Sequence, residues 1–172
     1  RRVLFRSVYG KSKEAGEYAI ISAYKESANQ NGRYVILRTS WVYGDGNNFI
    51  RTILRLAKDR PLLRVINDQY GVPASANWLA EISCNLTLAD DGLREFRSGI
   101  YHATPNGETT WHGLACLAVQ ATLDAGVNMK AKSASILPIP ATDYPLPAPR
   151  PMNSRMSTQK LQKALSQFGL MS

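Results

Sequence analysis

Residues 34–37 read Tyr-Val-Ile-Leu, and they follow a helical segment that runs from Gly10 to about Asn29. A short, continuously apolar run is typical of a strand buried in a parallel sheet. In the preceding segment, small and aromatic residues recur at three- and four-residue spacing, as in a helix: Ala15, Tyr18, Ala19, Ser22 and Ala23. Gly32 predicts the end of that helix, because glycine readily takes the left-handed cap conformation. A helix followed by a buried strand is half of a parallel crossover unit, so this stretch predicts an α/β fold.

Further helices and strands are predicted along the rest of the chain. Helices are expected at 49–59, 78–87 and 111–125, and strands at 62–66, 99–103 and 136–139. The helix caps are expected to be Ser75, either Thr109 or Thr110, and Ser157 before a last helix. Six prolines between Pro138 and Pro151 exclude a regular helix there.

The composition favours one globular domain of 172 residues with 44% hydrophobic content. No apolar run approaches the ~20 residues of a membrane span. The net charge of +8 is scattered rather than clustered, so we expect no nucleic-acid partner. Cys84 and Cys116 lie in apolar helical patterns without metal-ligand spacing, which predicts reduced core residues and a cytoplasmic location. His102 and His112 have no matching ligand set, so structural roles are expected for both.

The first seven residues, Arg-Arg-Val-Leu-Phe-Arg-Ser, match the translation of a common sequencing-adapter oligonucleotide. We therefore predict that residues 1–7 are an artefact and that residues 8–172 form a single fragment, truncated at its amino terminus.

Tyr9 and Lys13 are the first candidates for chemistry. On a helix, residues four apart lie on the same face one turn apart. An ammonium group beside a phenol favours the phenolate, so Lys13 can prepare Tyr9 to exchange a proton near neutral pH. The same spacing also occurs on ordinary amphipathic helices, so the pair by itself leaves both interpretations open.

Thr39, Ser40 and Trp41 directly follow the predicted strand at 34–37. Ligands of open α/β sheets bind outside the carboxyl ends of the strands, so these side chains are placed to line a pocket. Trp41 and Tyr43 could equally cover the end of the sheet.

Several blocks together resemble the dTDP-4-dehydrorhamnose reductase family of the extended short-chain dehydrogenase/reductase superfamily. They are Tyr-Gly-Lys-Ser-Lys-Glu-Ala-Gly-Glu at 9–17, Leu-Arg-Thr-Ser-Trp-Val-Tyr-Gly at 37–44, Asn-Asp-Gln-Tyr-Gly-Val-Pro at 67–73 and Arg-Pro-Met-Asn-Ser-Arg at 150–155. The resemblance runs from Val8 to the end. It implies the carboxyl-terminal portion of a Rossmann-type NAD(P)-binding fold, mixed with the smaller nucleotide-sugar-binding subdomain.

The resemblance also implies a function and a set of site residues. The reaction is NADPH- or NADH-dependent reduction of the 4-keto group of dTDP-4-dehydro-6-deoxy-L-mannose, giving dTDP-L-rhamnose. Tyr9 would be the proton donor, and Lys13 would lower its pKa and hold the nicotinamide ribose. The nicotinamide end of the cofactor would lie by Thr39 and Ser40. The candidates for substrate binding are Trp41, Asn48, Gln69, Arg150 and Arg155, the last of which could instead form an ordinary salt bridge.

Two of the departures of this chain from the family pattern concern its cofactors. It holds no Gly-x-Gly-x-x-Gly turn, so most of the cofactor site is expected in a missing amino-terminal half. Without the strands of that half, the sheet would expose an unpaired edge. We therefore expect this chain by itself to be insoluble or molten and inactive. Asn77 and Gln159 stand where some members carry magnesium-binding glutamates, so no metal is predicted. A homodimer is possible.

Two alternatives remain open. Another nucleotide-sugar epimerase or dehydratase of the superfamily is less favoured, because many of those relatives carry Asn where this chain has Trp41. The other alternative is a non-catalytic relative that resembles the regulatory subunit of methionine adenosyltransferase.

Overall fold

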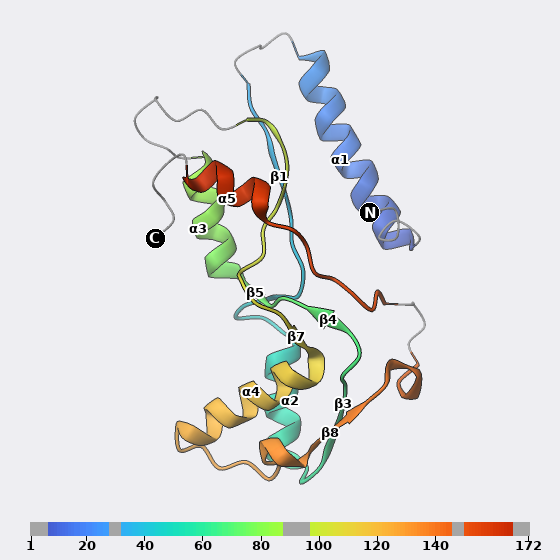
Figure 1. Ribbon diagram of the computed structural model, residues 1–172, viewed down its shortest axis with the longest axis vertical. Helices are drawn as coiled ribbons and strands as arrows, with labels where there is room; N and C mark the ends of the chain where they lie inside the picture. Colours follow the sequence, from blue (N-terminus) through green and yellow to red (C-terminus); the bar gives the residue numbers. More distant parts are fainter. Residues whose placement is uncertain (1–6, 28–31, 88–96, 146–149, 167–172) are drawn as a thin grey trace. The chain divides into compact units, whose positions relative to one another are not determined.

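The computed structural model describes residues 7–27, 32–87, 97–145 and 150–166 (Figure 1). The chain divides into two compact units made of interleaved segments. The first unit comprises Arg1–Arg38, Ala80–Ala103 and Ser157–Ser172, and the second comprises Thr39–Leu79 and Thr104–Met156. The chain therefore passes from one unit to the other after residues 38, 79, 103 and 156.

The first unit is organised around two paired strands. Strand β1 (Val35–Arg38) runs parallel to β6 (Gly99–His102), with Val35 opposite Gly99 and Arg38 opposite His102 (Figure 1). Helix α1 (Val8–Glu26) precedes β1, and α5 (Gln159–Ser166) packs on β6. Helix α3 (Ala76–Thr87) has most of its length in this unit. The parallel pairing expected from the helix-then-strand pattern is confirmed, and the mixed α/β fold class is confirmed with it.

The face of helix α1 that is least exposed is not the face that carries its repeated small residues. Its residues that are not exposed follow the helical spacing of four, three, four and three: Gly10, Glu14, Glu17, Ile21 and Tyr24. By contrast, Tyr18 is 64% exposed and the alanines of the repeat are exposed too. The packed stripe therefore contains two carboxylates, and a charged partner on the sheet decides which face of α1 packs.

The second unit contains three further pairs of short strands. The parallel pairs are β2 (Val42–Tyr43) with β5 (Ala74–Ser75), and β3 (Leu63–Ile66) with β8 (Ile136–Ile139). Strand β4 (Tyr70–Gly71) pairs antiparallel with β7 (Thr109–Thr110). The remaining elements are α2 (Phe49–Asp59), α4 (Trp111–Asp124), and the short 3₁₀ turns η2 (Ser133–Ser135) and η3 (Ala141–Asp143).

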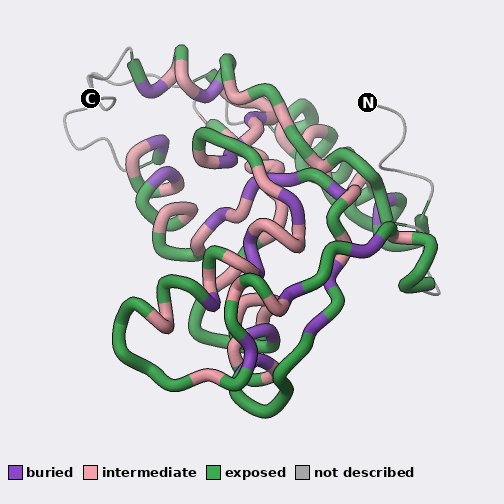
Figure 2. The backbone as a smooth tube through the Cα atoms, turned by 60° about the horizontal axis from the view of Figure 1, so that its bottom comes forward, coloured by how far each residue is buried: buried purple, intermediate pink, exposed green. Residues whose placement is uncertain are grey.

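The core of the second unit lies where α2, α4, β3 and β8 meet. Its buried members are Ile53, Ala57, Leu63, Val65, Ala115, Val119, Ala131 and Ile136. Helix α2 presents one apolar face to this core, because Ile53 and Ala57 are buried while Arg51, Arg55 and Lys58 are exposed. Figure 2 shows the buried positions, in purple, in short stretches spread along the chain. Val119 is fully buried, and burying such a side chain contributes about 1.5–3 kcal/mol.

The predicted caps are confirmed at two helices and wrong at the third. Ser75 Oγ accepts from Trp78 N at the start of α3, and Thr110 Oγ1 accepts from Gly113 N at the start of α4. Helix α5 begins at Gln159, so Thr158 rather than Ser157 is the residue that precedes it. Helix α1 ends at Glu26, three residues before the predicted end. In the part of the chain that the structure describes, no helix is both long enough and apolar enough to cross a lipid bilayer.

Candidate functional site

Tyr9 and Lys13 lie in the first turns of α1, where the helix start is fixed by a side-chain cap. Ser7 Oγ accepts a hydrogen bond of 3.0 Å from Gly10 N. Residues 1–6 of the predicted adapter segment lie outside the described residues. Lys13 Nζ is 5.2 Å from the centroid of the Tyr9 ring, and Tyr9 is 71% exposed. The spacing of the two residues therefore does place the ammonium group beside the phenol ring, on an accessible part of the helix.

The other seven candidates all belong to the second unit, and they start directly after β1. Thr39 Oγ1 is buried and has no hydrogen-bond partner among the described residues. Ser40 Oγ donates to Val72 O at 3.2 Å. A buried hydroxyl without a partner costs about 1–3 kcal/mol, so Thr39 is an unsatisfied group that a ligand atom could satisfy.

Trp41 is held in a tight aromatic cluster. Its ring stacks on Trp111 with centroids 3.7 Å apart and planes 14° apart, and Trp111 in turn meets Phe49 at 4.6 Å. Trp41 has a φ of 49°, in the left-handed region that side chains rarely occupy. A Cβ built on Gly71 would lie only 2.4 Å from Trp41 Cε2, so the indole takes the space that a side chain at residue 71 would fill. Trp111 received no role from the sequence, although it directly follows a predicted cap.

The block Asn67-Asp68-Gln69 joins separate segments of the second unit. Asn67 Oδ1 accepts from Thr110 Oγ1 at 2.8 Å, and both carboxylate oxygens of Asp68 accept from Ala141 N at 3.0 Å. Gln69 is only 5% exposed, and its amide makes no hydrogen bond to any described residue. Gln69 therefore differs from Asn67 and Asp68, each of which accepts a hydrogen bond from another segment of the second unit.

Asn48, Arg150 and Arg155 occupy three different environments. Asn48 caps α2, since its Oδ1 accepts from Arg51 N, and its Nδ2 donates to the carbonyls of Gly44 and Gly46. Arg155 Nη1 donates to Glu108 Oε2 at 2.6 Å, which is the salt bridge left open as an alternative. Arg150 is exposed.

The histidines and cysteines make ordinary structural contacts. His102 Nδ1 lies 3.0 Å from Ser157 O, and His112 Nε2 lies 2.8 Å from Ile136 O. Both cysteines are free thiols, as predicted, but Cys84 is exposed and not a core residue. The expectation of a core position was wrong for Cys84, because the residues that α3 buries are Ile82 and Leu86. Burial raises the pKa of the Cys116 thiol. The cytoplasmic location stays a prediction.

No metal site is evident in the described residues, where no three His, Cys, Asp or Glu side chains gather. Asn77 and Gln159 are both exposed. The expectation that the protein holds no metal stays a prediction.

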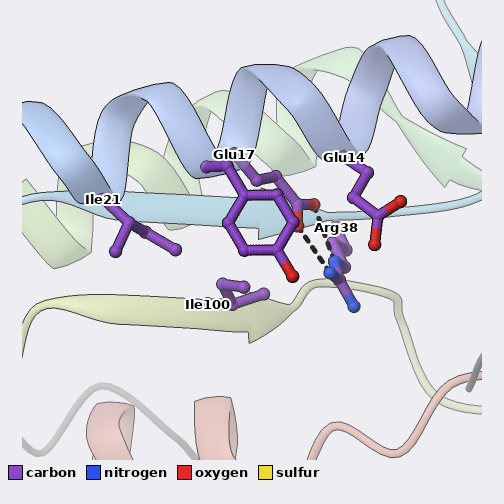
Figure 3. Close-up of a pocket in the computed structure, with 6 residues that line it drawn as sticks. Glu14, Glu17, Ile21, Arg38 and Ile100 are labelled. Atoms are coloured by element: carbon purple, nitrogen blue, oxygen red, sulfur yellow. Dashed lines mark hydrogen bonds and ion pairs between the residues drawn. The ribbon is translucent and has the colours of Figure 1, made fainter.

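A charged pair that received no role from the sequence lies between α1 and β1. Arg38 donates from Nε to Glu17 Oε1 at 2.7 Å and from Nη2 to Glu17 Oε2 at 2.5 Å (Figure 3). The hydrogen bond to Glu17 raises the pKa of Arg38 above its ordinary value, although burial acts against this. The pair borders a cavity of ≈ 100 Å³ that is also lined by Glu14, Tyr18, Ile21 and Ile100. Sequence spacing within one helix could not have revealed it, because its partners are 21 residues apart.

Several curated relatives of the chain are dTDP-4-dehydrorhamnose reductases. This chain is 42% identical over 158 residues to a dTDP-4-dehydrorhamnose reductase of Shigella flexneri. The aligned region covers 91% of this chain and 50% of that protein. A crystal structure of the Bacillus anthracis dTDP-4-dehydrorhamnose reductase in complex with NADP is 29% identical, with a TM-score of 0.70 over 96% of this chain and 50% of the other. The Clostridium acetobutylicum reductase is 32% identical, with a TM-score of 0.69 over 92% and 49% of the two chains.

The chain thus spans about half the length of the relatives that it matches. A family model described as the RmlD substrate binding domain matches residues 5–168. The resemblance drawn from the sequence motifs is confirmed, and the chain belongs to the RmlD substrate-binding domain family.

Proposed function

We propose that the chain is the carboxyl-terminal part of a dTDP-4-dehydrorhamnose reductase, in which Tyr9 and Lys13 carry the proton chemistry. The observation that carries the proposal is the placement of Lys13 Nζ 5.2 Å from the Tyr9 ring centroid on an exposed part of α1. The 42% identity to a curated reductase supports the choice of substrate class, dTDP-4-dehydro-6-deoxy-L-mannose.

One observation in particular supports a nicotinamide cofactor site in this chain. Thr39 Oγ1 is a buried hydroxyl without a partner among the described residues, at the end of a parallel strand where such ligands bind. Tyr9, Lys13, Thr39 and Ser40 would hold the nicotinamide end. When bound, NADPH or NADH would supply the hydride that reduces the keto carbon.

Tyr9 then completes the reduction. Its phenol O–H bond breaks as a new O–H bond forms on the alkoxide oxygen at C4 of the sugar, which leaves a phenolate. The Lys13 ammonium stabilises that phenolate, and solvent returns the proton. Trp41, Asn48, Gln69, Arg150 and Arg155 are the proposed substrate contacts. Gln69 has the strongest physical case, because the residue is only 5% exposed and its side-chain amide makes no hydrogen bond to a described residue. Arg155 has the weakest, because Glu108 already binds it.

The experiment places residues 8–172 behind the amino-terminal half of the Shigella flexneri reductase, in place of its own carboxyl-terminal half. We call this protein the fusion. It is expected to oxidise NADPH when the dTDP-4-keto sugar is added. Tyr9→Phe is expected to lower the rate by about 10²–10⁴-fold, because a positioned proton donor contributes that much.

The matched control is Tyr144→Phe, which removes a phenol that is 57% exposed and has no proposed role. Binding of the dTDP-sugar should change little in either variant. Turnover by Tyr9→Phe at the rate of the unaltered fusion would refute the role of Tyr9. A fusion that binds NADPH but reduces no dTDP-sugar would refute the proposed function.

A further inference from the structure

The interface between α1 and the strand pair of the first unit has an unusual composition. The stripe of α1 that is not exposed includes Glu14 and Glu17, and Arg38 faces them from the end of β1 (Figure 3). The Glu17 side chain is only 15% exposed and that of Arg38 only 27%. Removing a charge from water is costly, so a carboxylate is retained in such a place only when it is paired.

The pair has the geometry that specifies one orientation. Two donors of the Arg38 guanidinium meet the two oxygens of Glu17, at 2.7 and 2.5 Å. A two-pronged contact of this kind fixes direction as well as distance, whereas a single ammonium would fix distance only. Glu17 therefore sets both the rotation of α1 about its axis and its position along β1.

Arg38 is itself firmly placed at the other end of the contact. It is the last residue of β1, opposite His102 of β6, and its carbonyl accepts from Ala103 N at 2.8 Å. The next residue along the chain is Thr39. Glu17 follows Lys13 by one helical turn and Tyr9 by about two turns. The ion pair thus connects the helix that carries Tyr9 and Lys13 to the end of the strand from which the proposed cofactor residues continue.

We propose that the Glu17–Arg38 pair is a positioning element, which holds α1 at the rotation that Tyr9 and Lys13 need. The inference rests on the proposed reductase function. Side-chain atoms lie roughly 6 Å from a helix axis, so a rotation of about 10° moves them by about 1 Å. A misplacement of about 1 Å at a reacting group can cost about 100-fold in rate. Arg38 and Glu17 act through Tyr9 and Lys13 and do not touch the substrate.

The test uses the fusion that carries the full 8–172 segment, with Arg38→Met, Glu17→Gln, the two changes together, and Arg38→Lys. The control is Arg64→Met, which removes an arginine from the exposed Arg64–Asp143 pair of 3.4 Å. The turnover number is expressed per NADPH-binding site, so that misfolded molecules are not counted. The KM for the dTDP-sugar and the thermal midpoint are measured for each protein.

We expect each single change to lower kcat per site by about ten- to hundredfold, while KM for the dTDP-sugar changes by less than about threefold. The double variant should be no slower than the slower single variant, because both changes remove the same interaction. Arg38→Lys should recover part of the loss, since it keeps the charge without the fork. Arg64→Met should match the unaltered fusion.

Three results would overturn the inference: an unchanged kcat per site in Arg38→Met, losses that multiply in the double variant, or an equal loss in Arg64→Met. If Arg38→Met leaves no NADPH-binding molecules, kcat per site in Glu17→Gln and Arg38→Lys tests the inference instead. An unchanged kcat per site in both variants would then overturn it. Failure of the proposed function is distinguishable, because the unaltered fusion would then bind NADPH without reducing the sugar.

Discussion

Gly71 is the position at which a single methyl group should disturb the candidate site most directly. In Gly71→Ala, the new Cβ would lie 2.4, 2.7 and 2.8 Å from Cε2, Cζ2 and Nε1 of the Trp41 indole. Ordinary contact begins near 3.4 Å, so the ring or the backbone must move by about 1 Å. The indole has little freedom to do so, because Trp111 stacks on it at 3.7 Å.

The expected cost combines two effects, of which overpacking is the larger. Forcing an extra methyl group into a packed site costs about 1–3 kcal/mol. Disturbing the stack of Trp41 on Trp111 removes up to about 1 kcal/mol more, because an aromatic pair contributes about 0.5–1.5 kcal/mol beyond its buried area. We therefore expect Gly71→Ala to lower the free energy of unfolding by about 1–4 kcal/mol.

The assay is urea unfolding of the fusion, followed by tryptophan fluorescence and by circular dichroism. The matched control is Gly46→Ala, because a Cβ at Gly46 would meet nothing within 4 Å. Its free energy of unfolding should change by less than about 0.5 kcal/mol or rise slightly. The midpoint of Gly71→Ala should fall while the m-value stays constant. Equal stabilities for the two alanine variants would refute this account of the Trp41 environment.

Three other predictions concern single side chains. Asn48→Ala should cost about 1–2 kcal/mol in urea unfolding, since the cap of α2 is lost; a change below about 0.3 kcal/mol would contradict the capping role. Burial raises the pKa of Tyr101, so the stability that this phenol contributes is complete below its unfolded pKa of about 10 and is lost as the pH rises through the folded pKa. Thermal midpoints should therefore fall less steeply above about pH 10 in Tyr101→Phe, and identical slopes would count against this. Iodoacetamide should label exposed Cys84 before Cys116, whose pKa is raised by burial, and equal labelling rates by mass spectrometry would show otherwise.

The sequence predicted most elements because their signals are local. The extent of α2 and the Thr110 cap depend on residues within one or two helical turns, and both are confirmed. The predicted end of α1 and the predicted cap of α5 each differ from the structure by one to three residues. Helix ends fray, so their exact positions are the hardest part of a helix to predict.

The packed face of α1 could not be predicted, because the decisive partner lies on another element. Spacing favoured the face with Ala15 and Tyr18, yet Glu17 packs because Arg38 of β1 neutralises it. The same reason explains why the stacking of Trp41 on Trp111 went unforeseen. The two residues are 70 positions apart, and only the tertiary fold brings them together. The motif residues themselves were identifiable because a resemblance carries information about long-range contacts that periodicity lacks.

The interleaving of the two units has a consequence for how the chain is made on the ribosome. Strand β1 is synthesised roughly 60 residues before its partner β6. During that interval the second unit has begun to emerge but is also incomplete, because it needs β8 and the residues up to Met156. Neither unit can fold completely before most of the chain has left the ribosome. A nascent chain that stalls before residue 156 would therefore leave both units unfinished together.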